Sequence, residues 1–257
     1  MGVQAVGPQL RKWREQRRMS QLDLASDASI SPRHLSFVET GRSTPSREML
    51  LHLAEHLAVP LRERNVLLLA AGYAPTFPER PLDDPQLAQA RRAVDLVLAA
   101  QRPFPAFAID RHWRIVASNG ALGEMYAGVS PELLAPPPNA LRLSLHPQGL
   151  APRIENLGEW RAHLLLRLRD QLRLTADPEL LALQREVAAY PAPEEVVHGT
   201  DVLVPLRVRV GEEVLSFFST TMVFGTPAEV TLSELAVESF FPADAATDAA
   251  VRSLERR

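Results

Sequence analysis

The stretch QLDLASDASISPRHLSFVETGRSTP, residues 21–45, constrains the fold more than any other part of this sequence. Ser20 and Asp23 have the S-x-x-D spacing of a capping box, in which each side chain accepts a hydrogen bond from a free backbone N–H at a helix start. We therefore expect a helix from Gln21 to about Ala28, over which apolar residues recur at helical spacing.

A second helix is expected shortly after the first. Ser31 is a favoured N-cap, and Pro32 is tolerated at the first helical position because its missing N–H has no partner there anyway. This helix should run to about Thr40, since Gly41 is a natural stop. Residues 29–30 leave room only for a tight turn. The pattern therefore predicts a helix-turn-helix arrangement.

The outward face of the second helix has the residue types that contact DNA. A step of about 100° per residue places Leu35 and Val38 together and leaves Arg33, Ser36 and Phe37 on the opposite side. In a helix-turn-helix unit this helix enters the major groove, where arginine pairs with guanine and phenylalanine touches a thymine methyl group. With the flanking phosphate-binding positions, the residues expected to contact DNA are Gln21, Ser31, Pro32, Arg33, His34, Ser36, Phe37 and Arg42.

The run SQLDLASDASISPRHLSFVETGRSTPS resembles the Cro/phage-repressor (XRE) class of helix-turn-helix domains. Residues that this class favours stand at Gln21, Ala25, Ile30, Ser31, Leu35, Val38, Glu39, Gly41, Arg42 and Pro45. The resemblance implies a five-helix, lambda-repressor-like domain that binds DNA. The class usually has glycine where this chain has Ser29, which is therefore expected to adopt a left-handed conformation. Pro32 replaces a residue that often contacts a base, so base recognition should depend mainly on Arg33 and Phe37.

Composition is that of a globular chain, with 46% apolar and 23% charged residues in 257. No segment has the roughly 18 uncharged apolar residues of a membrane-spanning helix, and the first residues lack the apolar run of a signal peptide, so a cytoplasmic location without membrane contact is expected. The absence of cysteine excludes disulfides and cysteine-ligated zinc. Residues 1–75 carry 10 Lys and Arg against 7 Asp and Glu. This modest positive charge favours a homodimer on an inverted-repeat operator.

Three further helices complete the expected N-terminal domain, over residues 8–18, 46–57 and 61–72. The segment PTFPERPLDDP follows, and its four prolines predict a semi-rigid linker. The expected organisation is a helix-turn-helix domain at 1–74, a linker at 75–84 and a second domain at 85–257.

The second domain is expected to combine α-helices with a small antiparallel sheet, covered on one face by helices. The expected helices are 85–101, 120–128, 158–174, 178–190 and one from Ala245, with a proline-broken loop at 131–143. The expected strands are 104–110, 113–119, 201–210, 213–225 and 235–240.

Three segments of this domain resemble the MmyB-like ligand-binding domain found C-terminal to this helix-turn-helix class: NLGEWRAHLLLRLR, LHPQGLAP and VFGTPAEVTLSELAVESFFPADAATD. The resemblance covers residues 85–255 and implies a PAS-like fold with an interior pocket for a small, apolar, fatty-acid-like ligand. Inward side chains of the sheet and its facing helices would line that pocket. They are Phe104, Phe107, Trp113, Ile115, Met125, Tyr126, Trp160, Leu164, Phe217 and Met222.

Catalysis has no sequence signature here, because no nucleophile-elbow, zinc-protease, dinucleotide or P-loop motif occurs. His112, His146 and His163 are isolated in the sequence, and neither a metal nor a cofactor is predicted. Thr231 and Glu234 have capping-box spacing, which predicts a helix start. Two alternatives to a ligand-responsive regulator stay open: an enzyme tethered to DNA, and an antitoxin-like protein that binds a protein partner.

Overall fold

The computed structural model describes residues 5–121, 123–175, 177–193 and 203–255. The chain divides into two compact units. The first comprises residues 1–81 together with 226–233, and the second comprises 82–225 and 234–257. A short stretch from late in the sequence therefore belongs to the N-terminal unit.

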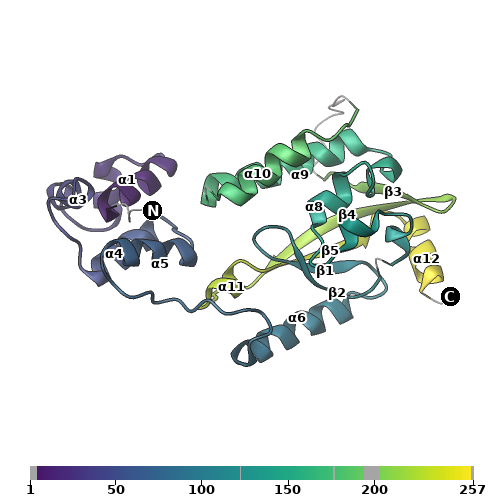
Figure 1. Ribbon diagram of the computed structural model, residues 1–257, viewed down its shortest axis with the longest axis horizontal. Coiled ribbons are helices and arrows are strands. Elements are labelled where there is room, and N and C mark those ends of the chain that lie inside the picture. Colours follow the sequence, from purple (N-terminus) through teal and green to yellow (C-terminus); the bar gives the residue numbers. More distant parts are fainter. Residues whose placement is uncertain (1–4, 122, 176, 194–202, 256–257) are drawn as a thin grey trace. The chain divides into compact units, whose positions relative to one another are not determined.

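The N-terminal unit contains the five expected helices, α1 Val6–Gln16, α2 Gln21–Asp27, α3 Pro32–Glu39, α4 Arg47–His56 and α5 Leu61–Ala70 (Figure 1). The capping box at the start of α2 is confirmed, since Ser20 and Asp23 exchange both side-chain-to-backbone hydrogen bonds. Ser31 caps α3 by accepting from the His34 N–H. Ser29 has a φ of 52°, the left-handed conformation expected for it.

Leucine and valine side chains from all five helices form the core of this unit. Leu24, Leu35 and Val38 are fully buried in it, as the helical spacing predicts. Gly7 lets α1 approach α3 closely, because a Cβ atom there would lie 2.4 Å from the Val38 carbonyl oxygen. These contacts hold α3 with its opposite face outward.

A five-stranded antiparallel sheet forms the centre of the C-terminal unit. Its strands are β1 Ala106–Ile109, β2 Ile115–Ser118, β3 Leu206–Val210, β4 Glu213–Val223 and β5 Ala236–Pro242, in the spatial order β2-β1-β5-β4-β3. All five strands were expected. The expected third strand began at 201, but residues 201–202 lie outside the described part of the chain and the observed strand begins at Leu206.

Helices cover both faces of this sheet, whereas cover on one face was expected. The α-helices of this unit are α6 Ala88–Ala100, α7 Pro131–Leu134, α8 Ala140–Leu145, α9 Leu157–Thr175, α10 Pro178–Ala188 and α12 Ala245–Leu254. Figure 1 shows α8, α9 and α10 on one side of the sheet and α6 on the other. On the α6 side, Val94 and Leu98 pack against Ala106, Ala108 and Val237.

The expectation of a proline-broken loop over residues 131–143 was wrong. Pro131 occupies the first turn of α7, where proline is tolerated, and the Asn139 side chain caps α8 by accepting from the Leu141 and Arg142 N–H groups. The prolines between α7 and α8 end α7 but do not prevent α8 from forming. Among the described residues, no helix is long and apolar enough to cross a membrane.

A candidate DNA-reading face and a candidate ligand cavity

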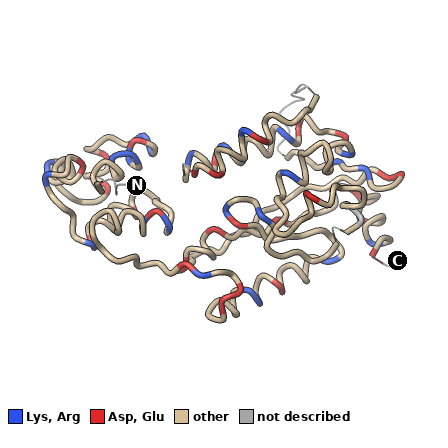
Figure 2. Tube along the Cα trace, viewed as in Figure 1, with Lys and Arg blue, Asp and Glu red and all other residues tan. Residues whose placement is uncertain are grey.

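Two arginines, one on α3 and one just after it, lie over the same aromatic ring on the exposed side of α3. The guanidinium carbon of Arg33 lies 5.3 Å from the centre of the Phe37 ring, and that of Arg42 lies 5.8 Å from it. Stacking uses the flat face of a guanidinium and leaves its N–H donors available for bases or phosphates. Figure 2 shows the distribution of Lys and Arg along the chain.

The eight residues expected to contact DNA all have solvent-accessible side chains. Arg33 and Arg42 are exposed, as are Ser31 and Pro32, whereas Gln21, His34, Ser36 and Phe37 are half-buried. Phe37 is thus not part of the buried core of this unit. Its apolar neighbours Leu35 and Val38 are fully buried.

A buried ion pair between Arg14 and Glu39 holds the Gln21 side chain in place. The Glu39 carboxylate accepts from Nε and Nη2 of Arg14 at 2.7 and 2.9 Å, and the Glu39 side chain is only 1% exposed. Its Oε2 also accepts from the Gln21 amide at 2.7 Å. Arg14 completes the network by donating to the Met19 carbonyl. Sequence reasoning placed Glu39 in the family pattern without finding this role, because Arg14 lies 25 residues away.

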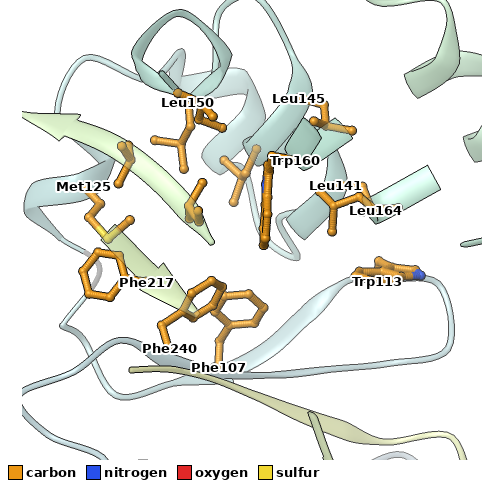
Figure 3. Packing of buried hydrophobic residues seen from close by; sticks show 14 of the residues in the cluster. Phe107, Trp113, Met125, Leu141, Leu145, Leu150, Trp160, Leu164, Phe217 and Phe240 are labelled. Carbon is orange, nitrogen blue, oxygen red and sulfur yellow. The ribbon is translucent and has the colours of Figure 1, made fainter. Parts of the chain in front are cut away.

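The C-terminal unit encloses a small apolar cavity between its sheet and α8 and α9. The cavity volume is about 50 Å³. Six of the ten expected pocket residues line it: Phe107, Trp113, Met125, Tyr126, Trp160 and Leu164. In Figure 3 the Trp160 indole projects from the helical side toward the rings of Phe107 and Phe240 on the sheet.

The other four expected pocket residues lie elsewhere. Phe217 is buried in the same core but does not border this cavity, and Phe104 and Ile115 pack half-buried against that core. Met222 was expected to face inward, which is wrong, since it is 53% exposed. Side chains alternate along a strand, so Met222, five positions after Phe217, points to the opposite face.

One wall of the cavity carries a second buried ion pair. Glu238 on β5 is 2% exposed and accepts two hydrogen bonds from the Arg167 guanidinium on α9. Thr221 on β4 donates to the same carboxylate at 2.8 Å and accepts from Arg167 at 3.0 Å. Arg167 also lies 4.9 Å from the Trp113 ring centre. The wall is therefore polar but has no net charge.

Trp113 occupies its place in the cavity despite an unfavourable backbone. Its φ is 63°, a left-handed conformation that costs a non-glycine residue about 1–2 kcal/mol. The Asp110 carboxylate supports this turn by accepting from the His112 and Arg114 N–H groups at 2.8 and 2.9 Å. The indole N–H donates to Gln171 at 2.8 Å. The surrounding fold therefore holds this ring in the cavity wall.

Several lining residues were not predicted from the sequence, including Ser144, Arg167, Glu238, Phe240, Leu206, Leu150 and the α8 residues Ala140, Leu141 and Leu143. Arg167 had a usable signal, since Trp160, Leu164 and Arg167 fall at i, i+4 and i+7 on one helical face. A carboxylate inside the apolar strand AVESFF was a second signal.

The three isolated histidines have structural surroundings. The His112 ring lies 3.0 Å from the Asp177 carboxylate, which also caps α10, and His146 accepts from the Gln148 N–H. His163 stacks on Trp160, and burial lowers the pKa of its imidazole. Across the residues that the structure describes, no three His, Asp or Glu side chains are grouped as a metal site would require.

Comparison with protein-family models gives two matches. Residues 90–254 match the MmyB-like transcription regulator ligand binding domain, and residues 10–64 match a helix-turn-helix domain. Both models describe parts of regulators, and neither describes an enzyme. No curated protein matches the chain. Both resemblances inferred from the sequence are confirmed. Because the first model covers more than half of the chain, this protein belongs to the MmyB-like family of helix-turn-helix transcription regulators with a C-terminal ligand-binding domain.

Proposed function

We propose that this regulator binds an inverted-repeat operator as a homodimer and that a small, mainly apolar molecule in the cavity changes its affinity for that operator. The observation that carries the proposal is the apolar cavity, closed on one side by the Arg167–Glu238 pair, in a chain that also presents the Arg33–Phe37–Arg42 face. Half-sites for such a dimer would lie about 10–10.5 base pairs apart or a multiple of it.

The size and charge of the cavity set the conditions under which the fatty-acid-like ligand implied by the resemblance could bind. Pockets for small molecules usually measure about 300–1,000 Å³, whereas this cavity measures about 50 Å³. A fatty-acid-like chain therefore needs the lining side chains to move apart. At the polar wall, a ligand carboxylate must compete with Glu238 for Arg167, whereas an uncharged hydroxyl group needs only a hydrogen bond.

Binding of a long-chain probe tests this assignment directly. Tetradecanoic acid and tetradecan-1-ol share an apolar chain and differ at the head group. In a Trp13→Phe background, the two cavity tryptophans report binding by their fluorescence, because Trp13 lies in the N-terminal core. We expect at least one probe to bind and to change operator affinity. Binding without any change in operator affinity would remove the sensing function.

The DNA face is tested by two arginine substitutions. Arg33→Ala should cost about 1–3 kcal/mol at one base position and relax specificity there. Arg42→Ala should weaken all sequences alike and reduce the slope of log K against log salt by about one. Arg209→Ala is the control, since Arg209 pairs with Glu155 in the C-terminal unit. An equal loss on every sequence from Arg33→Ala would exclude Arg33 from base recognition.

Native mass spectrometry tests the homodimer and the ligand together. We expect a dimer carrying a few hundred daltons of small molecule that is released on denaturation. A mass equal to one unliganded chain would count against the dimer on an inverted repeat.

A further inference from the structure

The connection between β4 and β5 belongs to the DNA-binding unit, although both of its strands belong to the ligand-binding unit. Residues 226–233 group with residues 1–81, and the chain returns to the other unit at Glu234. Within this connection, the short helix α11 Val230–Ser233 packs against α5. The ligand-binding sheet is thus joined to the DNA-binding unit by this connection as well as by the linker.

Three hydrogen bonds fasten this connection to the backbone of the linker. The Glu229 carboxylate accepts from the Arg80 N–H at 2.8 Å, and the Thr231 hydroxyl donates to the Arg80 carbonyl at 2.6 Å. The Val230 N–H donates to the Pro78 carbonyl at 2.8 Å. Val230 is fully buried and Glu229 is 7% exposed. We call Glu229, Val230 and Thr231 the latch.

One expectation from the sequence about this segment was wrong. Thr231 and Glu234 were expected to form a capping box, but α11 begins at Val230 and its start is capped by Glu229, whose second carboxylate oxygen accepts from the Leu232 N–H at 2.8 Å. Thr231 is therefore free to bond Arg80. The helix start and the attachment to the linker share one carboxylate.

The linker itself is fixed to α5 on the DNA-binding side. The Asn65 side chain accepts from the Thr76 and Phe77 N–H groups and donates to the Phe77 carbonyl at 2.7 Å. Arg62 pairs with Glu79 at 2.6 Å. Since α5 packs on α1, and α1 supplies Arg14 to Glu39 of α3, a displacement of the latch acts on the elements that hold the DNA-reading face.

The part of this hairpin that borders the cavity lies close to the connection. Glu238 and Phe240 of β5 line the cavity, and Thr221 of β4 bonds Glu238. Only Glu234 and Leu235 separate the last residue of the docked connection from β5. A ligand larger than about 50 Å³ must displace the lining, and β5 is part of that lining. The hairpin is thus the shortest covalent route from the cavity wall to the DNA-binding unit.

We propose that the latch transmits cavity occupancy to the DNA-binding unit, with Glu229 and Thr231 as positioning residues that keep the β4–β5 connection attached to the linker. This inference rests on the proposed sensing function. A ligand that moves β5 also displaces the latch residues Glu229, Val230 and Thr231. This displacement shifts α5, against which the connection packs. Coupling is reciprocal, so DNA bound to the N-terminal unit must alter β5 as well.

The test compares a latch variant with a matched control. Glu229→Met combined with Thr231→Val keeps both side-chain volumes close to the original and removes both side-chain hydrogen bonds to Arg80. The control is Ser233→Ala, which removes a hydroxyl that donates to the Val230 carbonyl of the same short helix. The full chain is used, with an operator duplex selected by the wild-type protein from a random-sequence pool.

Hydrogen exchange of peptides covering residues 226–242 is measured with and without the duplex. We expect the duplex to change exchange over β5 by about 5-fold or more in the wild type and in Ser233→Ala, the range of ordinary allosteric coupling. The change should fall below about 2-fold in the latch variant, while its affinity for the duplex stays measurable. No response in the wild type, or an undiminished response in the latch variant, would overturn the proposal.

The long-chain probes separate this proposal from the proposed ligand class. If the duplex acts on β5 through the latch but neither tetradecanoic acid nor tetradecan-1-ol binds, the latch stands and the ligand class fails. If a probe binds and changes operator affinity equally in the wild type and the latch variant, sensing stands and the latch is refuted.

Discussion

Each unit buries one carboxylate against one arginine, and the two pairs differ in what surrounds them. Around Glu39, Oε2 also accepts from the Gln21 amide, and Arg14 also donates to the Met19 carbonyl in the core of the unit. Around Glu238, Thr221 supplies one further bond and the remaining side faces the cavity. Its partner Arg167 is 26% exposed, against 9% for Arg14. We therefore expect the first pair to keep one geometry and the second to be open to a ligand group that approaches from the cavity.

The largest expected effect is therefore at Glu39. Glu39→Ala leaves Arg14 buried without its carboxylate and should destabilise the N-terminal unit by about 3–5 kcal/mol. Hydrogen exchange of α1 and α3 amides reports this unit alone. The matched control is Glu15→Ala, which breaks the exposed Arg11–Glu15 pair on α1 and should change stability by less than about 0.5 kcal/mol. Similar losses in the two variants would mean that the buried pair has no special role.

At Glu238 the expected effect is on ligand choice. Glu238→Gln keeps the volume but frees the Arg167 charge, so tetradecanoic acid should bind about 10-fold more tightly, which corresponds to about 1.4 kcal/mol. The affinity for tetradecan-1-ol should stay within about 2-fold. Fluorescence titration of both probes measures the difference. An equal increase in affinity for both probes would show that the substitution loosens the packing around the cavity and does not make the Arg167 charge available to the ligand.

Local chemistry explains how well the N-terminal unit was predicted. The start of α2 depends on Ser20 and Asp23, and that of α3 on Ser31 and Pro32, all within one turn of the helix that they begin. Such interactions are visible in the sequence because both partners are neighbours. The helices α2 and α3 followed from them, whereas the five-helix domain and the left-handed Ser29 were implied by the resemblance to the XRE class.

The cavity was predicted only in part, and the latch was not predicted, because the residues that meet in each are distant in the sequence. Arg167 meets Glu238 across 71 residues, and Thr231 meets Arg80 across 151. No local spacing indicates either contact. Met222 is different, since strict alternation from Phe217 already places it on the other face of β4.

A smaller effect should distinguish the strained Trp113 from the unstrained Trp160. Glycine adopts a φ of 63° without penalty, so Trp113→Gly should be more stable than Trp113→Ala by about 1 kcal/mol. Trp160 lies within α9, where glycine is worse than alanine by about 1 kcal/mol, so the order should reverse there. Chemical denaturation of the four variants gives both differences. The same order at both positions would mean that the turn at Trp113 relaxes when the indole is removed.

The smallest expected effect is the contribution of His163 to the pH dependence of stability. The pKa of His163 also depends on the charges of Arg167 and Glu238 in the cavity wall. Burial lowers the pKa of this imidazole below its ordinary 6.5, and Arg167 lowers it further while Glu238 opposes them. Above pH 6.5 the ring is neutral in both the folded and the unfolded chain, so it contributes no pH dependence. Below pH 6.5 the unfolded chain binds the proton more readily, so the free energy of unfolding falls as the pH drops toward the folded pKa.

Replacing His163 should flatten that response. His163→Gln should therefore lose less stability than the wild type between pH 6.5 and lower values, as measured by denaturation at a series of pH values. In Glu238→Gln, the carboxylate that opposes Arg167 is gone, so an NMR titration should find the pKa of His163 lower than in the wild type. An unchanged or higher pKa would mean that Arg167 leaves the cavity wall when Glu238 is neutralised. The position of Arg167 would then depend on its carboxylate partner as much as that of Arg14 depends on Glu39.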